Sequence, residues 1–311
     1  MISLNSCRRF GVELEINSFD KRNFKTNPLG IGELPYGIYN VGNLVAECFP
    51  GAKTIIKTWH PVHNNDYWIV KPDSSCGMEL CTPLIKGNFG YNTVYKIVSK
   101  IKEKYSDYVD ERCSFHIHVD VSDLTELQLS SVLAYWIKCE AVFMDAMPES
   151  RKKSRYCMPI GTLDVIQHDT MIEPQLLIRR LGLQKYYSLN TYHYSKDNRK
   201  SIEFRIADYT YCINPISARN WIKLIIHFVE CASQISIPHP YVAGDQWSSY
   251  LWLNPKEVFQ ILQFDQPLSD ELEEIKKWFV QKAKDNISNS SDGIWSETAR
   301  KISQEQFLSL F

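Results

Sequence analysis

The chain has 311 residues, of which 44% are hydrophobic and 23% charged, and this composition is typical of a globular protein with a full core. Its formal net charge of −1 argues against a strongly basic nucleic-acid-binding surface, and its apolar runs are too short to span a membrane. The nine cysteines are scattered without a Cys-x-x-Cys pair, and the N-terminus carries no apolar signal core. We therefore expect reduced thiols and a cytoplasmic location.

Four strands are predicted in the first half of the chain, where short apolar runs are bounded by turn residues. They cover residues 9–17, 67–70, 78–82 and 115–120. The second strand is followed by a predicted turn over 71–75, and the third is stopped by Pro83. Residues 18–67 are rich in Gly, Pro and Asn and predict an irregular insertion with one short helix near 41–48. Apolar residues at helical spacing predict a helix over 91–105.

The second half of the chain is predicted to be mainly helical. We expect Ser122 or Asp123 to cap a helix that runs to Met147, with Glu126 completing a capping box. The basic run at 151–155 is expected in a solvated loop. The remaining predicted elements are strands over 186–192 and 201–209, an amphipathic helix over 214–234 and three helices from residue 254 onward.

Polar and apolar residues alternate along the predicted strands, so side chains two positions apart point to the same face of a sheet. One face is apolar and holds Val12, Leu14, Ile117, Val119, Ile202, Phe204 and Ile206. The other face collects Glu13, Glu15, Glu79, His116, His118, Glu203 and Arg205. Because strands and helices come in mixed order with hairpin-like neighbours, we predict an α+β fold with helices on one face of a mainly antiparallel sheet.

This polar face has the composition of a divalent-metal site that also binds an anion. Mg²⁺ prefers carboxylate oxygens and retains substrate phosphates in its shell, and Mn²⁺ favours an added histidine. Several carboxylates on one face repel one another unless cations neutralise them. Arg205 could reach a phosphate that the metals also hold. Each pair taken singly is more often a solvated strand face or a surface ion pair, but their conjunction on separate strands favours metal binding.

The same residues belong to an ordered set of motifs that resembles the amidoligase family, whose relatives are glutamine synthetase and γ-glutamylcysteine ligase. The motifs lie at residues 10–15, 68, 73–74, 79–83, 115–119, 155–157, 187–190, 202–205 and 221–222. Each motif is weak singly, but the ordered set is specific.

The resemblance implies a curved, mainly antiparallel sheet of the glutamine synthetase type, with helices on its outer face, that cradles ATP and two or three Mg²⁺ or Mn²⁺ ions. It implies a ligase in which a carboxylate attacks the γ-phosphate of ATP and an amine then attacks the acyl phosphate, which yields an amide, ADP and phosphate. Glu13, His116 and Glu203 would hold the metal ion that bridges the phosphates. Glu15 and Glu79 would hold the metal ion near the carboxylate substrate.

The same resemblance implies further roles in catalysis and nucleotide binding. Arg205 would neutralise charge on the γ-phosphoryl group, and Glu203 and Glu15 would be the other catalytic residues. His118 would lie beside the nucleotide phosphates. The remaining nucleotide contacts would be Arg155, Asn190, Arg180 and Lys185. Asp73 becomes a further metal ligand only if its turn folds back over the metals.

A catalytic domain is implied over residues 1–236, interrupted by the insertion at 18–67, and it is followed by a helical extension over 237–311. The carboxylate and amine substrates could be small molecules, peptides or protein side chains, and the oligomeric state stays open. Three other functions could use the same motifs: an ATP-dependent phosphotransferase of guanidino-kinase type, a metal-dependent hydrolase, and a non-catalytic nucleotide- or metal-binding module.

Overall fold

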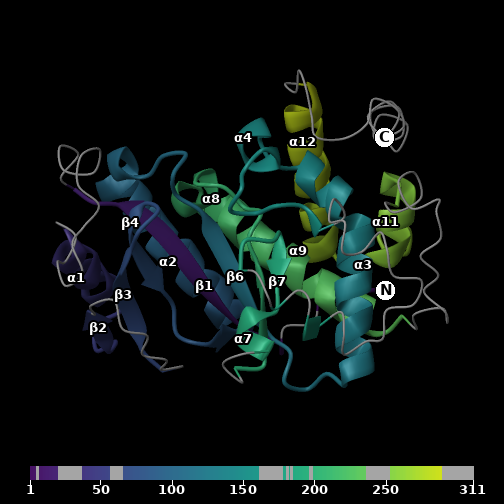
Figure 1. Ribbon diagram of the computed structural model, residues 1–311, viewed down its shortest axis with the longest axis horizontal. Helices are drawn as coiled ribbons and strands as arrows, with labels where there is room; N and C mark the ends of the chain where they lie inside the picture. The colour runs from purple at the N-terminus through teal and green to yellow at the C-terminus, as the bar shows by residue number, and fades with distance from the viewer. Residues whose placement is uncertain are drawn as a thin grey trace. The chain divides into compact units, whose positions relative to one another are not determined.

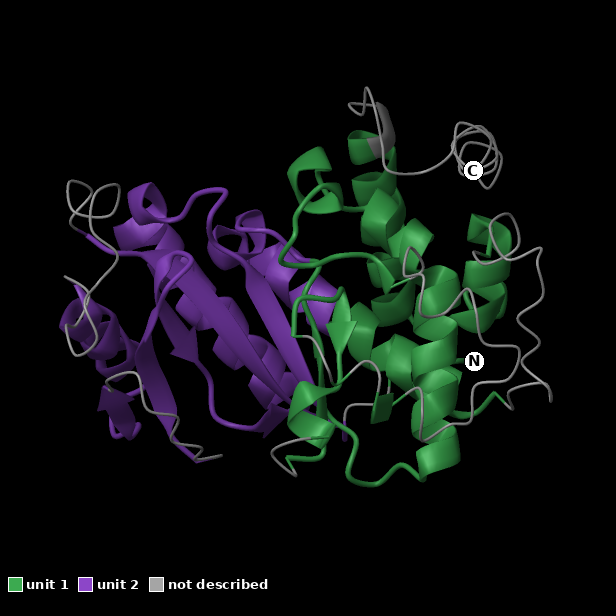
Figure 2. Cartoon of the chain, in the orientation of Figure 1, with its two compact units in different colours: residues 1–5, 120–206, 223–311 green, residues 6–119, 207–222 purple. Residues whose placement is uncertain are grey.

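The computed structural model (Figure 1) describes residues 1–4, 7–19, 37–56, 66–160, 178–179, 182, 185–195, 199–235 and 253–288. The chain forms two compact units (Figure 2). Unit 1 comprises residues 1–5, 120–206 and 223–311, and unit 2 comprises residues 6–119 and 207–222.

Unit 2 is built on a mixed, mostly antiparallel sheet. Its strands, in spatial order, are β2 (Thr54–Ile56), β3 (Trp68–Asp73), β4 (Gly77–Cys81), β1 (Arg9–Asn17) and β6 (Phe115–Asp120). The short strand β5 (Ile85–Lys86) pairs with the start of β1. Only the β2–β3 pair is parallel among the pairs of this unit in the described residues. Together with the helices, this sheet confirms the predicted α+β class.

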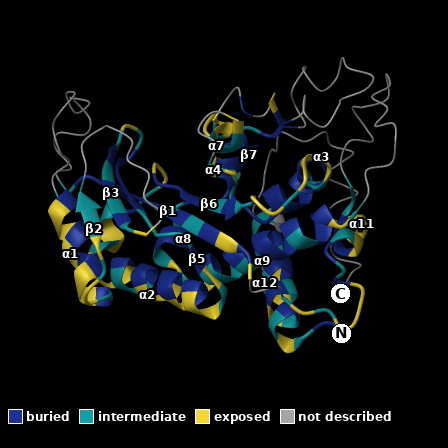
Figure 3. Ribbon diagram, turned by 90° about the horizontal axis from the view of Figure 1, so that it is seen from below, coloured by how far each residue is buried: buried dark blue, intermediate teal, exposed yellow. Residues whose placement is uncertain are grey.

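Helices cover the apolar face of this sheet, which the even-numbered residues of β1 form. The described helices of unit 2 are α1 (Ile38–Cys48), α2 (Gly87–Tyr105), the 3₁₀ turn η1 (Ser106–Tyr108), α8 (Thr210–Ile213) and the start of α9 (Pro215–Ser233). Helix α2 packs against β1, and the rings of Phe10 and Tyr91 stack with their centroids 5.6 Å apart. Figure 3 shows the exposed residues of α2 along one side of the helix and its buried residues along the other. Since α2 occupies the apolar face, the odd-numbered residues of β1 point away from it.

Gly90 permits this close approach of helix and strand. A Cβ atom at this position would lie 3.0 Å from the end of the Phe10 ring and 3.3 Å from Ile85, so a larger residue would need these side chains or α2 to shift.

Unit 1 is mainly helical. Its elements are α3 (Glu126–Asp145), α4 (Glu149–Lys152), β7 (Leu189–Asn190), α7 (Tyr192–Ser195), β8 (Ser201–Phe204), the end of α9 (Pro215–Ser233), α11 (Pro255–Ile261) and α12 (Asp270–Ser288). Trp136 of α3 lies at its centre, with ring centroids 4.8 Å from Phe204 and 5.5 Å from Phe228. This aromatic cluster ties the strand β8 to the helices α3 and α9.

The predicted turn over 71–75 is wrong at its start, because β3 continues through Lys71 and Pro72 to Asp73. The sequence Lys-Pro-Asp favours a turn locally, but β4 pairs with these residues, and Pro72 lies opposite Met78. The proline is tolerated because, in the described residues, the pairing of β2 with β3 reaches only Val70. Pro72 therefore lies where its missing N–H removes no described ladder bond.

The predicted cap of α3 is also wrong. Thr125 is the N-cap residue, and its side chain forms a capping box with Gln128. Ser122 instead donates its backbone N–H to Asp120, and Leu124 N–H donates to the carbonyl of Val121. These turn bonds delay the start of the helix by one turn.

The predicted strands over 186–192 and 201–209 are shorter in the structure, where they appear as β7 and β8. The Asn190 side chain accepts from the N–H of Tyr192, and this Asx turn ends β7 and leads into α7. Two of the three C-terminal helices are present as α11 and α12, and the third lies outside the described residues. The predicted domain boundary at 236/237 stays a prediction.

All nine cysteines are free thiols, as expected. No helix in the described part of the chain is long and apolar enough to cross a bilayer.

The imidazole of His227 makes the stability of unit 1 depend on pH. Its Nε2 atom lies 2.8 Å from the carbonyl oxygen of Leu262, and its ring stacks on Phe264. Burial lowers the pKa of His227 below its usual value, although the Leu262 carbonyl partly opposes this. The neutral ring therefore contributes stability that is fully present above the unfolded pKa of about 6.5 and is lost as the pH falls toward the folded pKa.

We predict that lowering the pH below about 6.5 weakens the wild type more than His227→Gln, whose amide can still donate to Leu262 but does not titrate. Urea unfolding of both proteins between pH 8 and pH 5.5 measures the difference. A difference in unfolding free energy that stays constant over this range would contradict the assignment.

Candidate functional site

The polar face of the unit 2 sheet gathers five of the residues selected from the sequence. In antiparallel pairs, residues that lie directly opposite point to the same face. Glu15 of β1 lies opposite Glu79 of β4, and Glu79 lies opposite Lys71 of β3. Glu13 lies opposite His116 of β6, and the next residue of that face on β6 is His118.

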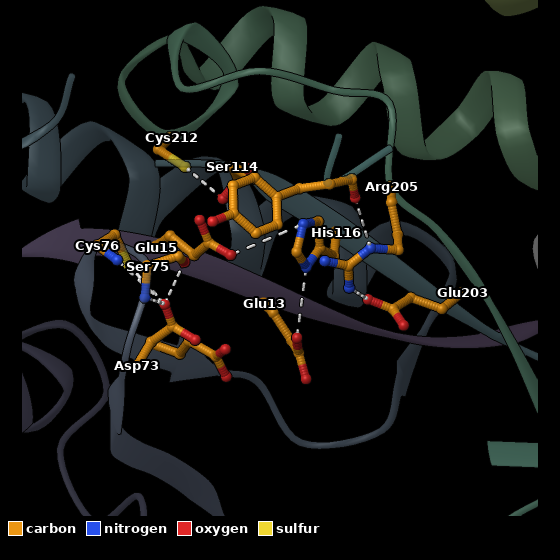
Figure 4. Close-up of polar contacts among 12 residues, drawn as sticks. Glu13, Glu15, Asp73, Ser75, Cys76, Ser114, His116, Glu203, Arg205 and Cys212 are labelled. Atoms are coloured by element: carbon orange, nitrogen blue, oxygen red, sulfur yellow. Dashed lines mark hydrogen bonds and ion pairs between the residues drawn. The ribbon is translucent and has the colours of Figure 1, made fainter. Parts of the chain in front are cut away.

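Glu13 is held by three basic groups. Its carboxylate lies 3.5 Å from Nδ1 of His116, 3.2 Å from Nε2 of His118 and 3.8 Å from Nζ of Lys71. Figure 4 shows the Glu13 side chain pointing toward the His116 ring. Burial on its own would raise the pKa of Glu13, but the Lys71 ammonium, with His118 and His116, holds this pKa well below its usual value. Glu13 is therefore ionised.

Glu79 behaves differently although its carboxylate is closer to Lys71, at 2.5 Å from Nζ. Burial and the neighbouring Glu13 carboxylate raise the pKa of Glu79 well above its usual value. One ammonium and two imidazoles face four carboxyl groups of unit 2, those of Glu13, Glu15, Asp73 and Glu79. The carboxyl groups therefore either keep a proton, for which Glu79 is the favoured holder, or take up a further cation.

Asp73 is brought to this face because β3 extends further than predicted. Its Oδ1 atom accepts from the N–H of Ser75 at 2.7 Å and from the N–H of Cys76 at 3.1 Å (Figure 4). Burial alone would raise the pKa of Asp73, but the hydrogen bonds from Ser75 and Glu79 lower it. The turn that follows β3 thus holds Asp73 as an ionised neighbour of Glu15.

Two groups of side chains in unit 2 offer ligand atoms that lie within 4.8 Å of one another. They are Glu13 with Glu79 and Cys81, and Glu15 with Asp73 and Cys76. Carboxylate oxygens are the donors that Mg²⁺ and Mn²⁺ prefer. Burial raises the pKa of the Cys76 thiol, which keeps it protonated and a poor ligand. The donor set therefore fits a hard divalent cation better than a thiolate-bound metal such as Zn²⁺.

The other predicted residues belong to unit 1, where Glu203 and Arg205 form an ion pair. Glu203 is buried and also accepts from the side-chain amide of Asn190 at 2.7 Å. The Nε of Arg205 donates to the carbonyl of Tyr156 at 3.3 Å, and its backbone N–H donates to Ser188. The guanidinium is thus fixed from several sides at the end of β8.

Arg151 supports the same strand end, which corrects the prediction of a solvated basic loop. Arg151 and Lys152 are buried in the short helix α4. Arg151 donates to the carbonyls of Arg205 and Ile206, the latter at 3.2 Å. A buried guanidinium with five N–H donors suits this role because it can satisfy two carbonyls at once.

Arg155 and Lys185, both predicted to contact the nucleotide, lie on the surface of unit 1. The Arg155 guanidinium lies over the ring of Tyr156, 5.0 Å from its centroid, and the Lys185 ammonium lies 5.2 Å from the centroid of Tyr186. Lys185 also accepts, through its carbonyl, from the amide of Asn190 at 3.1 Å. Arg180 lies outside the described residues.

The sequence reasoning missed Lys71 and Arg151. Lys71 lies two residues from Ile69 and Asp73, on the face opposite the buried Val70, so a predicted strand extended past Val70 would have placed it on the polar face. Arg151 left no such signal, because its partners lie 54 and 55 residues away in the chain.

An α+β fold whose polar sheet face gathers carboxylates and imidazoles is a candidate metal-dependent enzyme. A family model described as "Putative amidoligase enzyme" matches residues 47–211. The match covers more than half of the 311 residues, and the chain therefore belongs to this family, which indicates an enzyme of the carboxylate–amine ligase type.

One solved structure that is similar to the chain is a bifunctional glutathione synthetase from Pasteurella multocida. The identity is 11% and the TM-score 0.46, and the alignment covers 98% of this chain but 53% of that one. The chain therefore spans about half the length of that enzyme. No curated protein matches the chain.

A buried hydrogen-bond network positions Ser188 immediately before β7. Its hydroxyl accepts from Nε1 of Trp136 at 2.9 Å and donates to the carboxylate of Glu140, which also accepts from the N–H of Ile160 at 2.9 Å. Glu140 and Ser188 are fully buried, so each needs the other as a partner.

We predict that Ser188→Ala lowers the free energy of unfolding by about 1–3 kcal/mol, because it removes one donor to a buried carboxylate and the acceptor of a buried indole N–H. Ser130→Ala on the same helix as Trp136 is the matched control. Ser130 is equally buried, and its hydroxyl has no hydrogen-bond partner in the part of the chain that the structure describes. Urea unfolding of the two variants compares them, and equal losses would show that the network contributes nothing.

Proposed function

We propose that this protein is an ATP- and Mg²⁺-dependent carboxylate–amine ligase with a glutamine synthetase-like catalytic sheet, and that it forms an amide through an acyl phosphate. Membership of the amidoligase family supports the ligase class. The observation that carries the metal dependence is the crowding of Glu13, Glu15, Asp73 and Glu79 on one sheet face. Such a face is stable when a cation neutralises it, and Mg²⁺ prefers these oxygen donors.

In this proposal Glu13, Glu15, Glu79 and His116 hold Mg²⁺, as the family resemblance implies. Mn²⁺ would serve as well, since it accepts the imidazole more readily. Bound metal would supply charge stabilisation for the phosphates of ATP. The family resemblance implies that Glu203 would also bind a metal ion and that His118 would lie beside the phosphates of ATP.

Two bond changes make up the reaction. An oxygen of the substrate carboxylate forms a bond to the γ-phosphorus while the bond from that phosphorus to the β,γ-bridging oxygen breaks, which releases ADP. The amine nitrogen then forms a bond to the acyl carbon, phosphate leaves, and the nitrogen loses a proton. Charge grows on the transferred phosphoryl group in the first step, and donors fixed in advance stabilise it best.

In unit 1, Arg205 is suited to stabilise the charge on the transferred phosphoryl group. Its guanidinium is oriented by Glu203 and by the carbonyl of Tyr156, and Arg151 holds the carbonyl of Arg205 itself. An arginine held in this way loses little conformational freedom when it contacts a phosphoryl group. The carboxylate and amine substrates remain to be identified, and they could be small molecules, peptides or protein side chains.

We predict that Glu15→Gln and Glu203→Gln each reduce ADP release by at least ~100-fold, because each removes charge from the site that binds and activates ATP. Glu103→Gln, on the exposed surface of α2, is the matched control and should keep wild-type turnover. ADP release is measured with Mg²⁺ against a panel of acids and amines, and circular dichroism checks the fold of each variant. Turnover near the wild-type rate in either test variant refutes its assignment.

The substrates that turnover requires and the product that forms distinguish the ligase from the three other candidate functions. ADP release that needs both an acid and an amine, with amide detected by mass spectrometry, supports the ligase. A stable phosphorylated product without amide indicates a phosphotransferase of guanidino-kinase type. Turnover without ATP indicates a metal-dependent hydrolase. Calorimetric titration with an ATP analogue that gives Mg²⁺-dependent binding but no turnover across the panel indicates a non-catalytic binding module.

A further inference from the structure

Lys71 lies in the middle of the carboxylate face of unit 2. It occupies the same row of the sheet as Glu79 and Glu15, one residue from each of the strands β3, β4 and β1. Its Nζ atom lies 2.5 Å from Oε2 of Glu79 and 3.8 Å from Oε1 of Glu13. A basic side chain in this place is unexpected if the surrounding carboxylates serve only to bind metal ions.

The carboxylates that Lys71 contacts are two of the three members of a candidate metal site. Glu13, Glu79 and Cys81 offer ligand atoms within 4.8 Å of one another, a spacing suited to a single ion. The thiol of Cys81 also lies 4.0 Å from Oε1 of Glu13. The Lys71 ammonium lies within ion-pair distance of both carboxylates of this group. It therefore places a positive charge where a metal ion bound by this group would lie.

We infer that the ammonium of Lys71 takes the place of one divalent ion at the Glu13–Glu79 pair, so that the carboxylate face binds one divalent ion fewer than its ligands alone would hold. Lys71 pairs with Glu13 and Glu79, so the Glu15–Asp73 group remains for a divalent ion. The inference rests on the proposed function for the choice of Mg²⁺ or Mn²⁺ as that ion, and it revises the ligand set given there, because Lys71 rather than a divalent ion then neutralises the Glu13–Glu79 pair.

Electrostatics gives the expected consequence of removing this charge. An ammonium is a compact single charge with three donors, and it neutralises one carboxylate while satisfying another by a hydrogen bond. Without it, Glu13 keeps His116 and His118 as basic neighbours, whereas the buried Glu79 loses its ammonium partner beside the Glu13 carboxylate. Two like charges at this separation are costly, and a divalent ion in the vacated space is the direct way to remove that cost.

The test counts Mn²⁺ ions bound per chain, without nucleotide, from the electron paramagnetic resonance signal of free Mn²⁺. The full-length wild type is compared with Lys71→Met, which keeps the aliphatic length, and with Lys71→Arg, which keeps the charge. We expect Lys71→Met to bind one more Mn²⁺ than the wild type, and Lys71→Arg to bind the wild-type number.

Lys100→Met is the matched control. Lys100 has nearly the same side-chain exposure as Lys71, 36% against 37%, and it pairs with Glu103 at 2.7 Å on α2. Its removal should leave the number of bound ions unchanged. Where Lys71→Met fails to fold, Lys71→Gln provides the same uncharged comparison.

An equal number of bound Mn²⁺ ions in the wild type and Lys71→Met overturns the inference, because the metal then displaces Lys71 or does not bind beside it. Absence of Mn²⁺ binding in both proteins overturns it as well. The count needs no ATP and no substrate, so a failure of the ligase assay leaves it intact. A working ligase whose Lys71→Met variant gains no ion refutes this inference alone.

Discussion

Repulsion among buried carboxyl groups is the constraint on which the candidate site depends. Glu15 and Glu79 lie opposite each other on adjacent strands, and Glu13 lies on the same face. Burial strengthens their repulsion because it removes the water that would screen the charges. Lys71, His116 and His118 oppose this repulsion, and burial together with the Glu13 carboxylate raises the pKa of Glu79. Such a face is poised to exchange protons for a metal ion.

Burial of the apolar face of β1 stabilises the strand that carries these carboxylates. Phe10, Val12, Leu14 and Ile16 are buried to 1% exposure or less beneath the helices of unit 2. Each such side chain contributes about 1.5–3 kcal/mol when it is fully buried, so the apolar face of β1 offsets the cost of the charges on its polar face.

In unit 1 a buried carboxylate is neutralised by a residue close to it in the sequence. Glu203 is buried, but its charge is matched within two residues by Arg205, and Asn190 supplies a further hydrogen bond. The carbonyl of Tyr156 then orients the guanidinium, while the carbonyl of Ser188 and the buried Arg151 hold the backbone of Arg205. One unit thus offers acidic groups suited to a metal, and the other offers an oriented cation suited to a phosphoryl group. Both features agree with a ligase of the amidoligase family.

The sequence by itself determined the faces of β1 and β6, because alternation along a strand is a local property that the residue order contains. It therefore placed Glu13, Glu15, His116 and His118 on one side before any partner strand was known. The roles of Lys71 and Arg151 were decided only by the tertiary structure. Locally, Lys71 precedes a proline and favours a turn, and pairing with β4 makes it a strand residue. Arg151 sits in a basic run that favours solvent, and carbonyls more than fifty residues away bury it. Hydrogen bonds between distant segments outweighed local preference at both positions, and no local pattern encodes them.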